Sequence, residues 1–134
     1  MTVEGLVVCL SRLNRILGIY PEGRYAVAQP GVTNLELQDA LAPIGFFYAP
    51  DPASQKVATL GGNAGENSGG PRCLKYGVTT NNLLGVTMVM MDGTVVELGS
   101  TGGLAIVGGA IGVHLIRVGL VVRDVGNVGF AWCG

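Results

Sequence analysis

The stretch from Tyr48 to Thr80 constrains the fold of this chain more than any other part of the sequence. Within it, glycine occupies positions Gly61, Gly62, Gly65, Gly69, Gly70 and Gly77, with Asn63, Asn67 and Ser68 between them. Each glycine inside a helix or strand costs about 0.5–1 kcal/mol relative to alanine, so this density disfavours regular structure. We therefore predict a sharply turning loop whose main chain lies close to a ligand. Consecutive N–H groups in such a loop can form a nest for an anion, most often a phosphate.

A glycine-rich surface loop without a ligand is the alternative interpretation. Pro50, Pro52 and Pro71 restrict the backbone on both sides of the glycines, which predicts a pre-shaped loop. The interleaved asparagine and serine side chains offer hydrogen-bond donors and acceptors suited to a polar ligand. These features favour the ligand-binding interpretation.

The run PDPAS at Pro50–Ser54, followed by TLGGNAGENSGGPRCLKYG at Thr59–Gly77, carries a family resemblance. It is similar to the FAD-binding domain of FAD-linked oxidases of the glycolate oxidase and D-lactate dehydrogenase type. The likeness extends upstream through RLNRIL (Arg12–Leu17) and VAQPGVTN (Val27–Asn34), and downstream through MDGTVVELGS. Neither the G-x-G-x-x-G dinucleotide motif nor the phosphate-binding motif G-x-x-x-x-G-K-[ST] occurs in the sequence.

The resemblance implies an α+β fold, specifically a fragment of the FAD-binding domain of vanillyl-alcohol-oxidase-like flavoproteins. We expect residues 1–100 to form this partial domain. Residues 101–134 are expected to be a divergent tail rich in glycine and valine, whose place in the family fold is left open. The implied cofactor is FAD, and the complete enzyme would oxidise a D-2-hydroxy acid, glycolate or D-lactate, to the 2-oxo acid.

The positions that the resemblance assigns to FAD binding lie in and around the glycine-rich stretch. They are Pro50, Asp51, Pro52, Ser54, Thr59, Gly61, Gly62, Asn63, Asn67, Gly69, Gly70 and Tyr76. The hydroxyls of Ser54 and Thr59 would bind a phosphate or ribose, and the amides of Asn63 and Asn67 would bind the edge of the flavin ring. For each of these, the alternative is a turn residue that bonds to its own backbone. Tyr76 either lies near the cofactor or fills the core.

Composition narrows the remaining classes of function. The chain has 134 residues, enough for one domain, and a net charge of −1 gives no electrostatic case for nucleic acid. Cys9, Cys73 and Cys133 lack metal-site spacing, so we expect free, mostly buried thiols in a reducing cytosol. The single histidine, His114, stands in an apolar run and is interpreted as a packed or capping residue and not as a ligand. We predict no metal site.

Parts of the family's chemistry have no counterpart in this sequence. The resembling enzymes carry a further glycine-rich turn upstream and a substrate cap with metal-binding histidines downstream. We therefore predict no catalytic residue and expect the chain to be incomplete and inactive alone. The expected partners are FAD, the hydroxy acid in a complete enzyme, and the subunits of a glycolate-oxidase-like complex. The expected location is cytoplasmic, with peripheral membrane attachment through those subunits left open.

Two other classes of protein stay open. One is a non-catalytic subunit or interaction module that keeps part of the flavoprotein fold. The other is a small membrane-associated protein that uses the uncharged run Leu98–Ile116, although glycines interrupt this run and a span needs about 20 apolar residues. We expect no transmembrane span.

The local pattern predicts several helices and strands. Thr33 and Glu36 have the spacing of a capping box, so a helix should begin there, with Leu37, Leu41 and Ile44 on its buried face. Apolar residues on both faces of the run at 83–91 predict a strand buried on both sides. The dipeptide Asp92-Gly93 predicts a hairpin turn. Further short strands are expected at Leu6–Leu10, Tyr25–Gln29, Phe46–Tyr48 and Thr94–Leu98.

Overall fold

The computed structural model describes residues 9–90, 92–99, 114–121 and 123–124. In chain order the elements are β1 Ile16–Tyr20, β2 Tyr25–Ala28, α1 Asn34–Leu41, the 3-10 helix η1 Ala42–Ile44, β3 Phe46–Phe47, α2 Leu60–Glu66, α3 Cys73–Tyr76, the 3-10 helix η2 Thr79–Asn82, β4 Leu83–Val89, β5 Val95–Gly99, β6 His114–Val121 and β7 Arg123–Asp124. The mixture of helices and antiparallel strands confirms the predicted α+β class.

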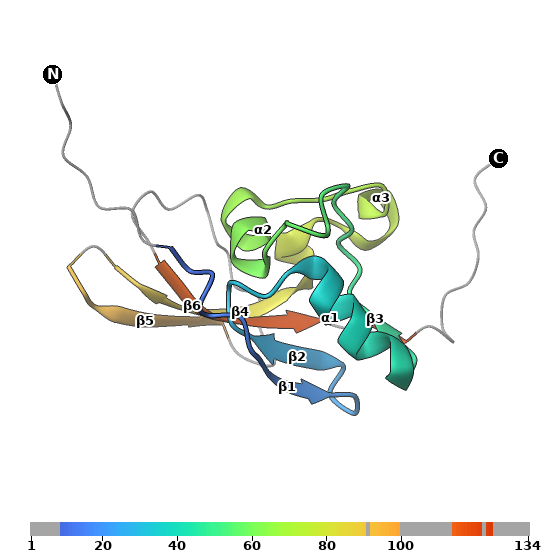
Figure 1. Ribbon diagram of the computed structural model, residues 1–134, viewed down its shortest axis with the longest axis horizontal. Helices are drawn as coiled ribbons and strands as arrows, with labels where there is room; N and C mark the ends of the chain where they lie inside the picture. Colours follow the sequence, from blue (N-terminus) through green and yellow to red (C-terminus); the bar gives the residue numbers. More distant parts are fainter. Residues whose placement is uncertain (1–8, 91, 100–113, 122, 125–134) are drawn as a thin grey trace, which may run out of the picture.

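Among the described residues, the main sheet has five strands in the order β1-β2-β6-β4-β5. Each neighbouring pair is antiparallel, and β3 pairs with β7 in a separate two-stranded sheet. The labelled helices α1, α2 and α3 lie on one face of the main sheet (Figure 1). The core lies between that face and the helices and contains Ala26, Ala28, Val32, Leu37, Leu41, Tyr48, Leu60, Ala64, Leu83, Val86, Met88 and Leu120.

The hairpin of β1 and β2 forms one edge of the sheet. In β2 the alanines are fully buried while Tyr25 and Val27 are half-buried, the period-2 alternation of a strand with one core face. The rings of Tyr20 and Tyr25 stack across the hairpin with centroids 4.6 Å apart. The predicted strand before Pro30 is confirmed.

Helix α1 begins where its capping box predicts. The Thr33 hydroxyl accepts from the Glu36 N–H at 3.2 Å, and the Glu36 carboxylate accepts from the Thr33 N–H at 2.8 Å. Leu37 and Leu41 are fully buried, as expected. The prediction for Ile44 is wrong, because this side chain is 45% exposed. Pro43 lies in η1, whose tighter winding rotates the next residues away from the buried stripe of α1.

Strands β4 and β5 form the predicted hairpin around Asp92-Gly93. The Gly93 N–H donates to the Met90 carbonyl at 2.9 Å, and the Thr94 N–H donates to the Asp92 carboxylate at 2.9 Å. Burial of β4 on both faces was expected and is wrong: Leu83, Val86 and Met88 are buried, whereas its other side chains are half-buried. The described helices cover only one face of the sheet, which explains the difference.

Strand β6 lies inside the segment expected to be a divergent tail. It pairs with β2 on one side and with β4 on the other, so it joins the two hairpins into one sheet. Leu120 in this strand is fully buried. The domain boundary near Ser100 stays a prediction. Of the expected tail at 101–134, only residues 114–121 and 123–124 are described.

Three other predictions concern the first strand, the cysteine thiols and a membrane span. Residues 6–8 of the expected first strand lie outside the described residues, and positions 9–10 are not in a strand. Cys9 is exposed and Cys73 is intermediate in exposure, so the expectation of buried thiols is wrong for both, while Cys133 is not described. In the described part of the chain, no helix is both long and apolar enough to cross a membrane.

Candidate cofactor-binding site

Helix α2 occupies the centre of the glycine-rich stretch, where we predicted a loop. Three hydrogen bonds explain why these residues are helical despite their low propensity. The Thr59 hydroxyl caps the helix by accepting from the Gly62 N–H at 3.2 Å. The Leu60 N–H donates to the Val32 carbonyl, and the Gly61 N–H donates to the Pro30 carbonyl, each at 2.8 Å. Both carbonyls belong to the segment before α1. Leu60 and Ala64 are buried in the core. Tertiary packing of this kind outweighs propensities of about 1 kcal/mol per glycine.

Some of the glycines allow close packing within the protein itself. A Cβ atom at Gly61 would lie 2.6 Å from the Pro30 Cβ atom, which is closer than real contacts allow. A Cβ atom at Gly70 would collide with the Asp51 carbonyl oxygen, and the φ angle of Gly70 is 120°. At these two positions another segment of the protein packs too closely for a side chain, so glycine is required there whether or not a ligand binds.

Gly62 and Gly65 differ from these glycines because they lie on an exposed face of α2. No described atom lies within 4 Å of a Cβ atom placed at Gly65. At Gly62 the neighbour is the Thr59 hydroxyl of the same helix cap, at 3.2 Å. Burial does not explain the absence of side chains here. This open face of α2 is therefore where main chain is available to a ligand.

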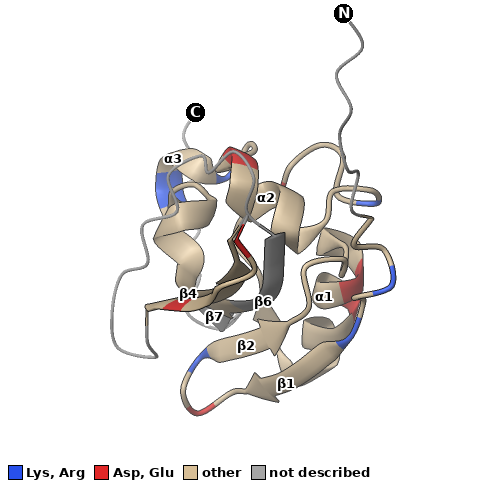
Figure 2. Ribbon diagram, turned by 90° about the vertical axis from the view of Figure 1, so that its left-hand side faces the viewer, with Lys and Arg blue, Asp and Glu red and all other residues tan. Residues whose placement is uncertain are grey.

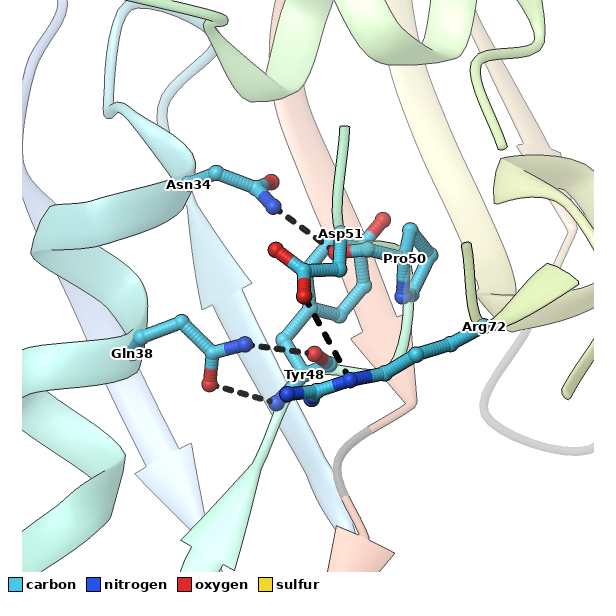
Figure 3. Close-up of polar contacts among 6 residues, drawn as sticks. All are labelled: Asn34, Gln38, Tyr48, Pro50, Asp51 and Arg72. Carbon is cyan, nitrogen blue, oxygen red and sulfur yellow. Dashed lines mark hydrogen bonds and ion pairs between the residues drawn. The ribbon is translucent and has the colours of Figure 1, made fainter. Parts of the chain in front are cut away.

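The turn at Pro50–Ser54 lies beside the segment that follows α2. Contact between Gly70 and the Asp51 backbone joins them, as does an ion pair of 3.3 Å between Arg72 Nε and Asp51 Oδ2 (Figure 3). The Arg72 and Asp51 side chains are 47% and 22% exposed, so the pair contributes about 0–1 kcal/mol. Asp51 also lines a pocket of about 380 Å³ together with Gln38, Phe47 and Arg72.

Asn63 and Asn67 occupy very different environments. Asn63 is 3% exposed, and its amide nitrogen donates to Asn34 Oδ1 at 2.9 Å. This amide bonds within the protein, and the flavin contact expected for Asn63 stays a prediction. Asn67 is exposed, and its side-chain oxygen accepts from the N–H and hydroxyl groups of Thr80.

The other predicted polar residues also make contacts within the protein. Thr59 caps α2, which resembles the alternative considered from the sequence in that its hydroxyl bonds to nearby backbone. Ser54 is exposed, and its carbonyl oxygen accepts from the N–H groups of Val57 and Ala58. Tyr76 is half-buried with its ring 5.7 Å from the ring of Phe47 in an edge arrangement. These contacts leave the predicted FAD contacts of Ser54, Thr59 and Tyr76 untested.

Sequence reasoning did not single out Asn34, Gln38 or Tyr48, which surround the predicted turn (Figure 3). The amides of Asn34 and Gln38 bond to the backbone at Pro50 and Tyr48. Tyr48 is fully buried, and desolvation raises the pKa of its phenol despite the nearby Thr79 side chain. Asn34 lies three positions before Leu37 and seven before Leu41, a spacing that puts all three on one face of a helix. This spacing is the signal from which its burial could have been predicted.

Charge and metal chemistry contribute little to this region. Charged side chains are scattered over the turn between β1 and β2, over α1 and over α3 (Figure 2). Among the described residues, no group of His, Cys, Asp and Glu side chains has an arrangement that could hold a metal ion. What the site offers is main chain, glycine surface and neutral polar groups.

Helices on one face of an antiparallel sheet, a glycine-rich helix with an open face, and a proline-rich turn packed against the segment after that helix give an α+β domain that offers main chain to a cofactor. The chain belongs to the FAD-binding domain family, whose model matches residues 1–99. Its fold is that of the FAD-binding domain of vanillyl-alcohol-oxidase-like flavoproteins, and FAD is the cofactor of this family.

Known proteins similar to this chain agree with the family assignment. It is 47% identical over 97 residues to the glycolate oxidase subunit GlcD of Escherichia coli (strain K12), covering 72% of this chain and 19% of that protein. It is 38% identical over 97 residues to the D-lactate dehydrogenase of Anaerostipes hadrus, covering 72% of this chain and 20% of that protein. A solved structure of alkyldihydroxyacetonephosphate synthase superposes with a TM-score of 0.73 at 26% identity, covering 85% of this chain and 22% of that one.

Proposed function

We propose that this chain supplies the FAD-binding part of a flavin-dependent oxidoreductase that oxidises a D-2-hydroxy acid, glycolate or D-lactate, to the 2-oxo acid. The support is its similarity to a glycolate oxidase subunit and to a D-lactate dehydrogenase. The chain covers only 19% and 20% of the length of these relatives. Oxidation of the hydroxy acid, assembly with other subunits and a cytoplasmic location are therefore part of the proposal.

The observation that carries the proposal is the open face of α2. Gly62 and Gly65 expose main chain there, and the Pro50–Ser54 turn contacts Gly70, in the segment that follows α2. A flat aromatic cofactor can lie flush against main chain only where no side chain projects. FAD, when bound, accepts the hydride from the substrate. The residues of this chain bind and orient FAD, and we assign none of them a role as catalytic base.

Substituting Gly65 tests the cofactor site. Leucine at this position meets no described atom within 4 Å of its Cβ, so the fold should accept Gly65→Leu. The side chain would project from the proposed FAD surface, and we expect the affinity for FAD to fall by at least about tenfold, equivalent to about 1.4 kcal/mol. Titration with FAD, followed by flavin fluorescence, measures the affinity, and thermal unfolding without FAD checks the fold.

Glu22→Leu, in the exposed turn between β1 and β2, is the matched control because it adds the same side chain far along the chain from α2. Equal affinities for the wild type, the control and Gly65→Leu would contradict the assigned surface.

To test the substrate class, glycolate or D-lactate is added without oxygen to the longest form of the protein that the cell makes. If neither acid bleaches the flavin absorbance, even after prolonged incubation, that part of the proposal fails.

An interaction module that does not turn over substrate is a second candidate, favoured by large exposed apolar side chains. Leu74 in α3 is 98% exposed and Val57 is 75% exposed. Contiguous exposed apolar surface often binds a partner, and these two side chains are the candidates for such a surface. A stable stoichiometric complex on size-exclusion chromatography, without flavin reduction by either acid, would favour the module over the enzyme.

A further inference from the structure

The first turn of α1 contains a polar side chain that is completely buried. Asn34 is 0% exposed, yet both ends of its amide are hydrogen-bonded. Its Nδ2 atom donates to the Pro50 carbonyl at 2.7 Å, and its Oδ1 atom accepts from Asn63 Nδ2 at 2.9 Å. A buried amide is stable only when its polar atoms are paired, and losing one partner costs about 1–3 kcal/mol.

The two partners of Asn34 belong to the two segments that form the proposed FAD surface. Pro50 begins the proline-rich turn, and Asn63 lies in α2. One side chain therefore joins turn and helix through a continuous chain of hydrogen bonds (Figure 3 shows its bond to Pro50). Neither bond requires a ligand.

The backbone of α1 strengthens this link. The N–H groups at the start of a helix have no partner within the helix and must be satisfied elsewhere. Here the Asn34 N–H donates to the Ala58 carbonyl at 2.9 Å, and the Leu35 N–H donates to the Gln55 carbonyl at 3.1 Å. The beginning of α1 thus holds the segment between the proline-rich turn and α2.

Gln38 makes a second clamp one helical turn further along. Its Nε2 atom donates to the Tyr48 carbonyl at 2.7 Å, and its Oε1 atom accepts from the Tyr48 N–H at 3.1 Å. Positions 34 and 38 lie on the same face of a helix. Figure 3 shows both amides of α1 directed toward the chain at Tyr48 and Pro50.

We propose that Asn34 is a positioning residue for FAD binding. It fixes the proline-rich turn against α2, with Gln38 fixing the entry to the turn, so that the FAD surface is already formed before the cofactor arrives. A preformed site loses less conformational entropy on binding. Asn34 itself is buried and does not contact FAD. This inference rests on the proposed FAD surface and adds the residue that determines its shape.

Asn34→Asp tests this role because its effect depends on pH. Burial raises the pKa of a carboxyl group at this position, so at mildly acidic pH the group is neutral, and its O–H can donate to the Pro50 carbonyl. At higher pH the group is ionised, loses that donor and faces the carbonyl oxygen. We expect FAD affinity about tenfold below wild type at about pH 8 and recovery toward wild type at about pH 5.

Two further variants complete the comparison. Asn34→Leu has similar size but no donor, so its affinity should stay low at every pH. Asn14→Asp makes the same chemical change at an exposed position and should follow the wild type. If Asn34→Leu does not fold, Asn34→Asp still provides the test, because one protein is compared with itself at two pH values.

Hydrogen exchange of the apo protein over residues 48–58 provides a readout that does not involve FAD. Compared with wild type at the same pH, Asn34→Asp should exchange faster in this segment at about pH 8 and equally at about pH 5. Wild-type affinity and exchange in Asn34→Asp at both pH values would overturn the inference. If the wild type binds no FAD, the proposed function fails, and the exchange data alone decide whether Asn34 holds the turn.

Discussion

At the scale of single residues, Tyr48 buries its phenolic hydroxyl in the core of the protein. It is fully buried, and its hydroxyl makes no hydrogen bond of regular geometry with the described residues, although the Thr79 side chain lies close enough to lower the pKa of the phenol slightly. Burial also raises the pKa of the phenol above its ordinary value of 10.0, because a phenolate would be poorly solvated there. The ring fills the core, and without a well-formed hydrogen bond the buried hydroxyl adds a desolvation cost that the nearby Thr79 side chain offsets only weakly.

We therefore expect Tyr48→Phe to leave the free energy of unfolding unchanged or to raise it by about 1–2 kcal/mol. Urea unfolding at neutral pH measures this difference. Above pH 10.0 the unfolded wild type releases the Tyr48 proton while the folded form keeps it, so wild-type stability falls as pH rises. This contribution to the pH dependence should be absent from Tyr48→Phe. A loss of stability at neutral pH would mean that the hydroxyl is satisfied in solution.

At the scale of elements, α2 shows what the sequence could and could not predict. The family likeness identified the right segment, but the glycine content predicted a loop, and the role of Thr59 as a helix cap was not predicted. The helix depends on hydrogen bonds to Pro30 and Val32, about 30 positions earlier, and local propensity contains no information about them. By contrast, the capping box of α1 is local, and the sequence placed that helix correctly.

Two glycines of α2 should respond oppositely to alanine. At Gly65 a Cβ atom meets open space, so Gly65→Ala should stabilise the apo protein by about 0.5–1 kcal/mol through helix propensity alone. At Gly61 the same atom would lie 2.6 Å from the Pro30 Cβ atom, so Gly61→Ala should destabilise by about 1–3 kcal/mol. The difference between the two variants in thermal or urea unfolding is the measurement. Equal changes of the same sign would mean that α2 is not packed as described.

The candidate site was predictable only in part. The sequence located the turn at Pro50 and the glycines of α2, because each type of residue has backbone preferences that are visible locally. It did not separate glycines that pack against the protein, such as Gly70, from those that face open space, such as Gly65. It also did not reveal the bond of the Asn63 amide to Asn34, because the two residues lie 29 positions apart in the sequence.

At the scale of the whole molecule, β6 decides whether the sheet is one unit. It lies between β2 and β4, so without it the described main sheet would separate into the β1–β2 and β4–β5 hairpins. Isolated two-stranded hairpins are only marginally stable in water. Leu120 carries part of this joining role, since it is fully buried and pairs with Ala26 of β2 on one side and Leu83 of β4 on the other.

Leu120→Ala should therefore lower the free energy of unfolding by about 2–5 kcal/mol, the usual cost of removing a buried leucine side chain. Val95→Ala, in the edge strand β5, is the matched control, because Val95 is 58% exposed and its loss should cost less than about 1 kcal/mol. Urea unfolding followed by circular dichroism gives both values.

A chain ending at Ser100 should show no cooperative transition in the same experiment. If that shorter chain unfolds cooperatively with wild-type stability, the sheet does not need β6, and the domain boundary expected near Ser100 from the sequence alone is the correct one.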